Sequence, residues 1–257
     1  MLAVVGAAVL AGCGGPQVVH PGHAVVSSDL GDRATQAVQG RVIVLDPGHN
    51  GGNASHATEI NKQVSDGRGG TKACNTTGTA TNAGYTEHAF TFDVAQRVAA
   101  VLREKSVQVV MTRDNDTGVG PCVDVRGKAA ERAGAEAMVS IHADGSSPGG
   151  RGFHVAYPSP PVNAAQGAPS LALATALRDG MRDSGLPLST YLGKQGLAAR
   201  SDLAGLNLAT RPVALVECAN MRNAAEAALV SSPDGRQRYA QAIAAGILRW
   251  LEQTPRS

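Results

Sequence analysis

The chain has 257 residues, of which 43% are apolar and 17% charged, so it can form one sizeable globular domain with a real core. Aromatic residues make up only 3% of the chain, and this scarcity argues against an array of aromatic carbohydrate-binding modules. The net charge is +2 with scattered basic residues, which argues against a nucleic-acid-binding protein.

The first thirteen residues are small and apolar and end in Leu-Ala-Gly-Cys, which resembles a bacterial lipobox. We expect residues 1–13 to be an export signal with Cys13 as the lipidated residue, and an ordinary cleaved signal peptide is the alternative. Either interpretation places the protein outside the cytoplasm, in the cell envelope, with a lipid on Cys13 as its one link to the membrane. Residues 14–40 predict a flexible tether in which His20 and His23 are solvated.

Strand and helix patterns alternate from residue 41 onward. Predicted strands cover residues 41–46, 107–111, 137–141, 152–157 and 213–216. Predicted helices cover residues 122–133 and 170–184, and two more begin after Thr86 and at Pro233. The alternation predicts one domain over residues 41–252, followed by a tail over 253–257. We expect a three-layer α/β fold with a mainly parallel, mixed sheet and helices on both faces.

The longest connection, residues 50–86, is rich in Gly, Asn, Thr and Ser and predicts a long, structureless loop that is functional or mobile. Cys74 lies in this loop and Cys122 follows another polar loop, so in an oxidising compartment the two are a candidate disulfide. Cys218 follows apolar strand residues and is predicted to be a small buried core residue. No two cysteines have the CxxC spacing, which disfavours a cysteine zinc site.

Three predicted strands end on side chains that can bind a metal or move a proton. His49 follows the Asp-Pro-Gly turn after the first strand, His142 follows the 137–141 strand, and Glu217 follows the last strand. Glu87 opens the helix after Thr86. Because the carboxyl ends of parallel strands and the N-termini of helices share one edge of a sheet, we expect these residues to meet. Two imidazoles and a carboxylate form the ligand set of a hydrolytic zinc site, and a second carboxylate can serve as its base.

The residue types alone leave the roles within this group open. Glu87 is a natural metal ligand because the helix fixes its direction, whereas Glu217 could be a ligand or a base. His88, beside Glu87, is a rival ligand. His56 and His154 are weaker rivals, because one lies in the long loop and the other inside a predicted strand.

Four segments together resemble the zinc-dependent N-acetylmuramoyl-L-alanine amidases of the third amidase type. They are Leu-Asp-Pro-Gly-His at 45–49, Glu-His at 87–88, Val-Ser-Ile-His-Ala-Asp at 139–144, and Val-Glu at 216–217 with Asn-Met at 220–221. The resemblance covers residues 41–252 and is closest to the short amidases of mycobacterial type. Those relatives share the segments at 67–72, 120–124 and 200–207.

The resemblance implies that His49, Glu87 and His142 bind one zinc ion and that Glu217 is the catalytic carboxylate. It implies a peptidoglycan hydrolase that cleaves the amide bond between N-acetylmuramic acid and the L-alanine of the stem peptide. The implied mechanism is attack by zinc-activated water with Glu217 as general base. We expect peptidoglycan or muropeptides as the substrate and a monomeric protein.

Some relatives carry a long inserted helix that plugs the zinc site. The interval from 144 to 170 is short and rich in Gly, Pro and Ser here, which predicts that no such plug is present. We expect the 50–86 loop or the Arg200-Ser201-Asp202 segment to line the substrate groove.

Two alternative functions compete with the amidase: another metallohydrolase, such as a zinc carboxypeptidase or deacetylase, and a non-enzymatic wall-binding lipoprotein. The second would be marked by loss of Glu217 or of a ligand, and neither is lost.

Overall fold

The computed structural model describes residues 1–3 and 36–256. The expected lipidated Cys13 and the tether histidines, His20 and His23, lie outside the described residues. Residues 36–40 are described, and within them Val38 is only 2% exposed and packs into the main core. Within the described part of the chain, every helix is too short or too polar to cross a membrane.

A six-stranded sheet in the order β4-β1-β5-β8-β6-β7 forms the centre of the domain. Its strands are β4 (Gln108–Met111), β1 (Val42–Pro47), β5 (Ala137–Asp144), β8 (Val213–Asn220), β6 (His154–Pro158) and β7 (Leu197–Arg200). The first four are parallel to one another, β6 runs antiparallel to β8, and β7 is parallel to β6. The predicted mainly parallel, mixed sheet is confirmed.

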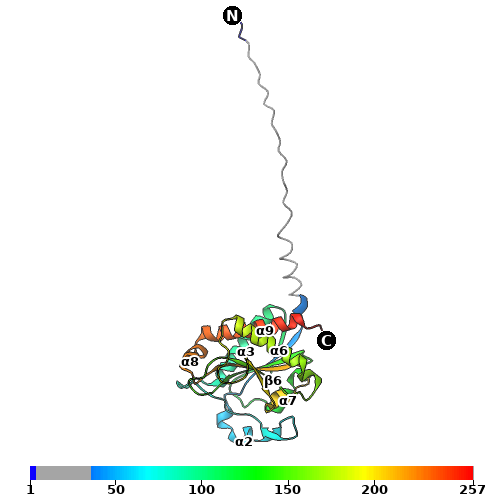
Figure 1. Cartoon of the computed structure of the whole chain (residues 1–257), viewed down its shortest axis with the longest axis vertical. Helices are drawn as coiled ribbons and strands as arrows, with labels where there is room; N and C mark the ends of the chain where they lie inside the picture. Colours follow the sequence, from blue (N-terminus) through cyan, green and yellow to red (C-terminus); the bar gives the residue numbers. More distant parts are fainter. Residues whose placement is uncertain (4–35, 257) are drawn as a thin grey trace.

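Helices cover both faces of the sheet, but unequally. The three long helices α3 (Glu87–Glu104), α6 (Ala168–Asp183) and α9 (Pro233–Gln253) share the larger hydrophobic core on one face, and Figure 1 shows them together on one side of the molecule. The other face carries the short helices α4 (Val123–Gly127), α5 (Ala129–Arg132) and α7 (Ala204–Asn207), with a smaller core. Helix α8 (Ala224–Ser231) packs against α9. The three-layer α/β prediction is confirmed.

Alternation along the strands decides which side chains face the thinner layer. In β1, Ile43 and Leu45 enter the larger core, and Val44 enters the smaller one. The same period of two sends a set of polar side chains to the face of the smaller core. Asp46, Ser140, His142 and Glu217 are among them, and these four line one cavity. The short helices leave room for that cavity over the sheet.

The 50–86 segment is not the structureless loop that its composition predicts. It contains the 3-10 turn η1 (Asn53–Ser55), the helical turn α2 (Ala57–Ile60) and a hairpin of β2 (Gln63–Ser65) and β3 (Thr71–Ala73). Each of these elements is only three or four residues long. Elements of that length carry no hydrophobic period, which is why the pattern missed them.

Other elements also differ from the sequence prediction because they are short or lack an apolar pattern. The predicted 122–133 helix is two short helices, α4 and α5, and the expected mixed loop at 185–212 contains β7 and α7. The strands β5 and β8 continue beyond their apolar runs, so His142 and Glu217 lie inside strands rather than after them. A polar side chain on the open face does not interrupt the backbone ladder, and His142 stays in register with Glu217.

Candidate metal centre

His49 is the first residue after β1 and its turn, and it is held by contacts on its ring and its backbone. Its φ of 60° lies in the left-handed region, which few residues other than glycine adopt. The ring Nδ1 donates to the carbonyl oxygen of Thr76 at 3.0 Å. That contact leaves Nε2 directed at Glu87, with 3.1 Å between Nε2 and Oε1. A metal-binding histidine is commonly oriented by such a bond from its other ring nitrogen.

Glu87 begins α3, and both of its carboxylate oxygens are engaged. Its Oε1 lies 2.9 Å from Nδ1 of His142 and also accepts from the backbone N–H of Ala143 at 3.2 Å. Its Oε2 accepts from the backbone N–H of Thr79 at 2.9 Å. The side chain is buried at the start of the helix, so its direction is fixed by both backbone and packing.

These three residues form a donor set that fits a divalent cation. One ligand atom from each of His49, Glu87 and His142 can be chosen so that all lie within 4.8 Å of one another. Burial lowers the pKa of His49, but the Glu87 carboxylate outweighs it, so the net pKa is raised. Burial likewise raises the pKa of Glu87, yet the two imidazoles hold it far below its ordinary value. Two nitrogens and one carboxylate oxygen around a point that favours positive charge match a zinc ligand set.

The close approach of the two histidines depends on a glycine between β1 and His49. A Cβ atom at Gly48 would lie 2.2 Å from Cε1 of His142, which is shorter than any tolerable contact. The two imidazole centroids are 4.9 Å apart and nearly perpendicular. Only a residue without a side chain allows the His142 ring to reach the turn.

Glu217 lies beside this set without joining it. It is in register with His142 of β5 on one side and with His154 of β6 on the other. Its Oε2 is buried and has no hydrogen-bond partner among the described residues. Burial, reinforced by the charges of Glu87 and Asp144, raises the pKa of Glu217 well above its ordinary value. A carboxyl with such a pKa is suited to accepting and returning a proton.

All four residues line one cavity of about 540 Å³. Its walls come from segments far apart in sequence, namely residues 72–73, 75–79, 123 and 203–205. The 50–86 segment, which we expect to line the substrate groove, contributes residues 72–73 and 75–79 to the wall of this cavity. The Arg200-Ser201-Asp202 segment does not line the cavity: Arg200 pairs with Asp202, and the residues that follow form the wall.

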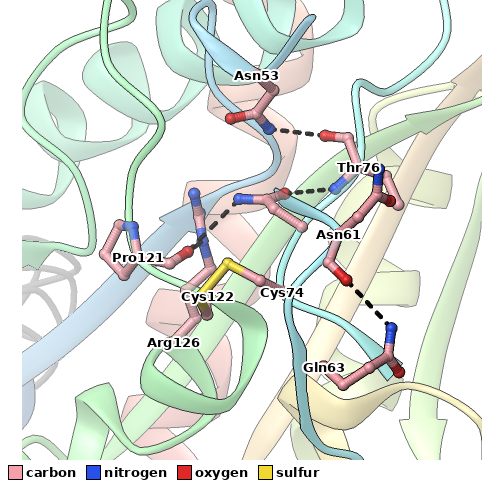
Figure 2. Close-up of a disulfide and its surroundings, with 9 residues drawn as sticks. Asn53, Asn61, Gln63, Cys74, Thr76, Pro121, Cys122 and Arg126 are labelled. Carbon is pink, nitrogen blue, oxygen red and sulfur yellow. Dashed lines mark hydrogen bonds between the residues drawn. A yellow bond between two sulfur atoms is a disulfide. The ribbon is translucent and has the colours of Figure 1, made fainter. Parts of the chain in front are cut away.

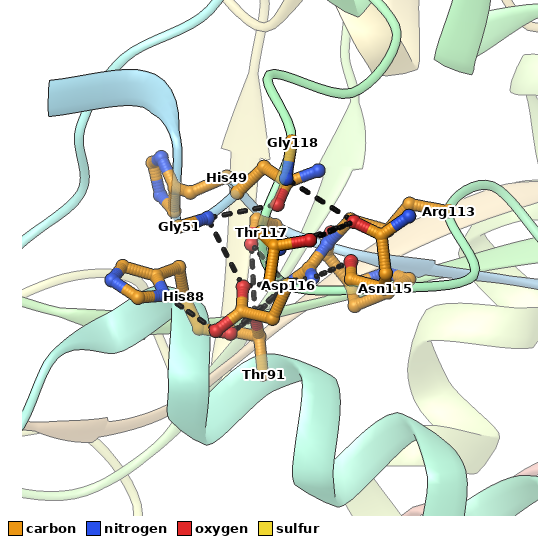
Figure 3. Close-up of polar contacts among 12 residues, drawn as sticks. His49, Gly51, His88, Thr91, Arg113, Asn115, Asp116, Thr117 and Gly118 are labelled. Atoms are coloured by element: carbon orange, nitrogen blue, oxygen red, sulfur yellow. Dashed lines mark hydrogen bonds and ion pairs between the residues drawn. The ribbon is translucent and has the colours of Figure 1, made fainter. Parts of the chain in front are cut away.

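The rival histidines lie outside the donor set. His88 Nδ1 is 2.7 Å from Oδ2 of Asp116, and Oδ1 of the same carboxylate accepts from the backbone N–H of Gly51, as Figure 3 shows. His56 Nδ1 donates to the carbonyl oxygen of Gly52 at 2.7 Å. His154 is fully buried, and burial lowers its pKa to about 4.

A disulfide and two arginines hold the segments that surround these four residues. The structure contains the Cys74–Cys122 disulfide, which joins the cavity wall to the start of α4, as Figure 2 shows, and Cys218 is buried as predicted. Two buried arginines, Arg113 and Arg126, donate to backbone carbonyls of the turn before His49. Sequence reasoning missed both arginines, because each follows a pattern typical of a solvated charge.

Comparison with known proteins shows the family of the chain. The sequence model of the N-acetylmuramoyl-L-alanine amidase family matches residues 43–249. The chain is 48% identical over 214 residues to N-acetylmuramoyl-L-alanine amidase Rv3717 of Mycobacterium tuberculosis, covering 83% of this chain and 88% of that protein. It is also similar to the crystal structure of the amidase Ami1 from Mycobacterium smegmatis, with a TM-score of 0.82 and 52% identity over 84% of this chain and 99% of the other. For Ami1 from Mycobacterium abscessus the TM-score is 0.81 and the identity 51%, over 83% and 100%. The chain therefore belongs to the N-acetylmuramoyl-L-alanine amidase family, the enzymes that cleave the amide bond between N-acetylmuramic acid and L-alanine in peptidoglycan.

Proposed function

We propose that the amidase activity of this chain depends on zinc, that His49, Glu87 and His142 hold one zinc ion, and that Glu217 is the general base. The observation that carries the proposal is the donor set within 4.8 Å, next to a carboxylate oxygen that has no partner among the described residues. Bound zinc would supply Lewis acidity toward the scissile carbonyl and would lower the pKa of water toward about 7.

Glu217 carries out the proton transfers in this proposal. Its Oε2 takes the proton of the attacking water and then delivers it to the departing amino group of L-alanine. The raised pKa of Glu217 supports the first of these transfers, because a carboxylate with a higher pKa is a stronger base toward the proton of the water. The carboxylate of the donor set is not available for this role, since both oxygens of Glu87 are engaged.

The remaining residues position the reacting groups. Thr76 directs the His49 ring, and the backbone N–H groups of Thr79 and Ala143 hold the Glu87 carboxylate. The cavity walls at 72–79 and 203–205 are the surfaces along which a muropeptide would lie. Other metallohydrolases use similar ligands, and family membership rather than ligand chemistry selects the muramoyl-alanine bond.

Action on peptidoglycan requires a location outside the cytoplasm. We propose export with a lipid anchor on Cys13 and a monomeric enzyme. Mass spectrometry of the mature N-terminus tests the anchor, because a diacylglyceryl group on Cys13 adds a defined mass that an ordinary cleaved signal would not leave. Size-exclusion chromatography with light scattering tests the monomer.

Two variants test the role assignment. Glu217→Ala is expected to retain zinc and lose nearly all turnover, whereas His49→Ala is expected to lose both. Metal content is measured by atomic spectroscopy and turnover by mass spectrometry of digested muropeptides. Full activity in a clean Glu217→Ala preparation would contradict the assignment of the base.

A further inference from the structure

We propose that Arg126 is a positioning residue of the metal centre, which holds His49 in the backbone conformation from which its ring reaches Glu87. The inference rests on the zinc site proposed above. It concerns a residue of α4 that neither contributes a donor atom nor touches the reacting bond. Arg126 lines the cavity and is only 3% exposed.

The backbone of His49 needs such support. A residue with a side chain reaches a φ of 60° only where its surroundings impose it. If His49 relaxed to an ordinary φ, its Cβ would leave the direction that brings Nε2 to 3.1 Å from Glu87 Oε1. The metal site therefore depends on whatever holds this one peptide.

Arg126 supplies that hold through a fork of hydrogen bonds. Its Nη2 donates to the His49 carbonyl at 3.0 Å, and its Nη1 donates to the Pro47 carbonyl at 2.8 Å. The same Nη1 pairs with Oδ1 of Asp46 at 2.8 Å, and Nε donates to the Pro121 carbonyl at 2.8 Å. A planar guanidinium held at both ends cannot rotate away, so the turn and α4 move as one unit.

The second arginine does not duplicate this function. Arg113 donates to the carbonyls of Pro47 at 3.0 Å and Gly48 at 3.3 Å, and Thr91 donates to Gly48 at 2.8 Å. These contacts stop one residue short of His49. Within residues 36–256, the hydrogen bond to the His49 carbonyl comes from Arg126 alone.

The ring and the backbone of His49 are held by two segments that are covalently joined. Thr76, which fixes the ring, lies shortly after Cys74, and Arg126 lies one helical turn after Cys122. Figure 2 shows Thr76 and Arg126 on either side of the Cys74–Cys122 bond. The disulfide thus links the two contacts that orient the same histidine.

Zinc affinity of metal-free protein tests the proposal, measured by competition with a chromophoric chelator. Arg126→Lys keeps the charge beside Asp46 but loses the fork, so we expect a 10- to 100-fold weaker Kd in a folded protein, about the size usual for residues that orient metal ligands. Arg41→Lys is the matched control, because Arg41 is also 3% exposed and binds Glu136 and the Thr254 carbonyl away from the cavity. Its Kd is expected to equal that of the wild type.

Asp46→Asn separates the positioning by Arg126 from the ion pair with Asp46. The variant removes the negative charge, but its amide oxygen can still accept a hydrogen bond from Arg126. It is expected to lose less than about tenfold in zinc affinity. A folded Arg126→Lys protein with wild-type affinity would overturn the proposal, as would an Asp46→Asn protein that loses as much as Arg126→Lys. If Arg126→Lys does not fold, the Asp46→Asn result alone decides: a loss of tenfold or more overturns the proposal. Wild-type protein that binds no zinc would instead refute the metal site itself.

Discussion

Glu217 stands opposite His142 in the register of β8 and β5, yet it takes no part in the hydrogen bonds that join His142 to Glu87. The two glutamates of the cavity therefore differ in kind. Glu87 has both oxygens engaged, whereas Glu217 has a buried oxygen without a partner among the described residues. This difference favours Glu87 as ligand and Glu217 as base, a choice that residue type alone leaves open.

Shortening Glu217 tests how closely the base must approach the reacting water. Glu217→Asp keeps a carboxylate but withdraws it by about one methylene. We expect zinc content to be unchanged and kcat to fall about 100-fold, because a displacement of about 1 Å costs that much in a positioned reaction. Steady-state kinetics on a purified muropeptide, with KM near the wild-type value, would agree. An unchanged kcat would show that Glu217 is not the base.

Gly48 is predicted to be indispensable for the metal centre. In Gly48→Ala the new Cβ would meet the His142 ring at 2.2 Å, so the ring must move and the donor set must open. We expect loss of zinc binding in a protein that still folds, measured by metal analysis beside circular dichroism. Gly149→Ala is the matched control, because nothing lies within 4 Å of a Cβ there. Normal zinc content in Gly48→Ala would contradict the claim that the site has no room for a side chain at residue 48.

The disulfide is expected to influence both stability and metal binding. Replacing Cys74 and Cys122 together by serine removes a crosslink across 48 residues, and we expect a loss of about 2–4 kcal/mol in the free energy of unfolding. Because the bond joins the segments that hold His49, zinc affinity should weaken as well. Urea denaturation and chelator competition measure the two effects. A less stable variant with unaltered zinc affinity would mean that the segments hold His49 independently of the crosslink.

Asp46 predicts a pH dependence of stability. Burial raises its pKa, but the charge of Arg126 and hydrogen bonds from Thr112 and Ser140 outweigh burial, so the folded pKa lies below the ordinary 3.8. A lowered folded pKa means that the carboxylate stabilises the fold fully above 3.8, and that this stabilisation is lost as the pH falls through the folded value. Asp46→Asn should be less stable by about 3 kcal/mol at pH 7.

Thermal denaturation of both proteins from pH 7 down to about pH 3 checks the sign, since the stability difference should shrink below pH 3.8. A difference that stays constant or grows on acidification would show that Asp46 is not the titrating group.

Local sequence signals predicted the four residues that the structure brings together at the cavity, namely His49, Glu87, His142 and Glu217. Apolar runs that end on His142 and Glu217, a turn that ends on His49, and a helix that opens on Glu87 are local signals, and an α/β sheet brings such positions to one region. The sheet order was not predicted, because pairing between β8 and the antiparallel β6 depends on contacts between distant segments.

The supporting residues could not be predicted from local pattern. Arg126 is separated from Asp46 by 80 positions in the sequence. The oxygen atoms that accept its hydrogen bonds come close to it only in the folded chain. The hairpin of β2 and β3 was missed for the same reason, because its short strands have no apolar period and depend on tertiary contacts. Local sequence thus indicates which side chains can react, and the fold decides how they are held.

The most direct test of the central claim is digestion of purified muropeptides by protein that has been stripped of metal with a chelator, before and after zinc is added back. The account predicts no turnover without metal and recovered turnover with about one zinc per chain. The product should be an intact stem peptide with L-alanine at its free amino end. Metal-free protein that cleaves muropeptides at the untreated rate would contradict the account.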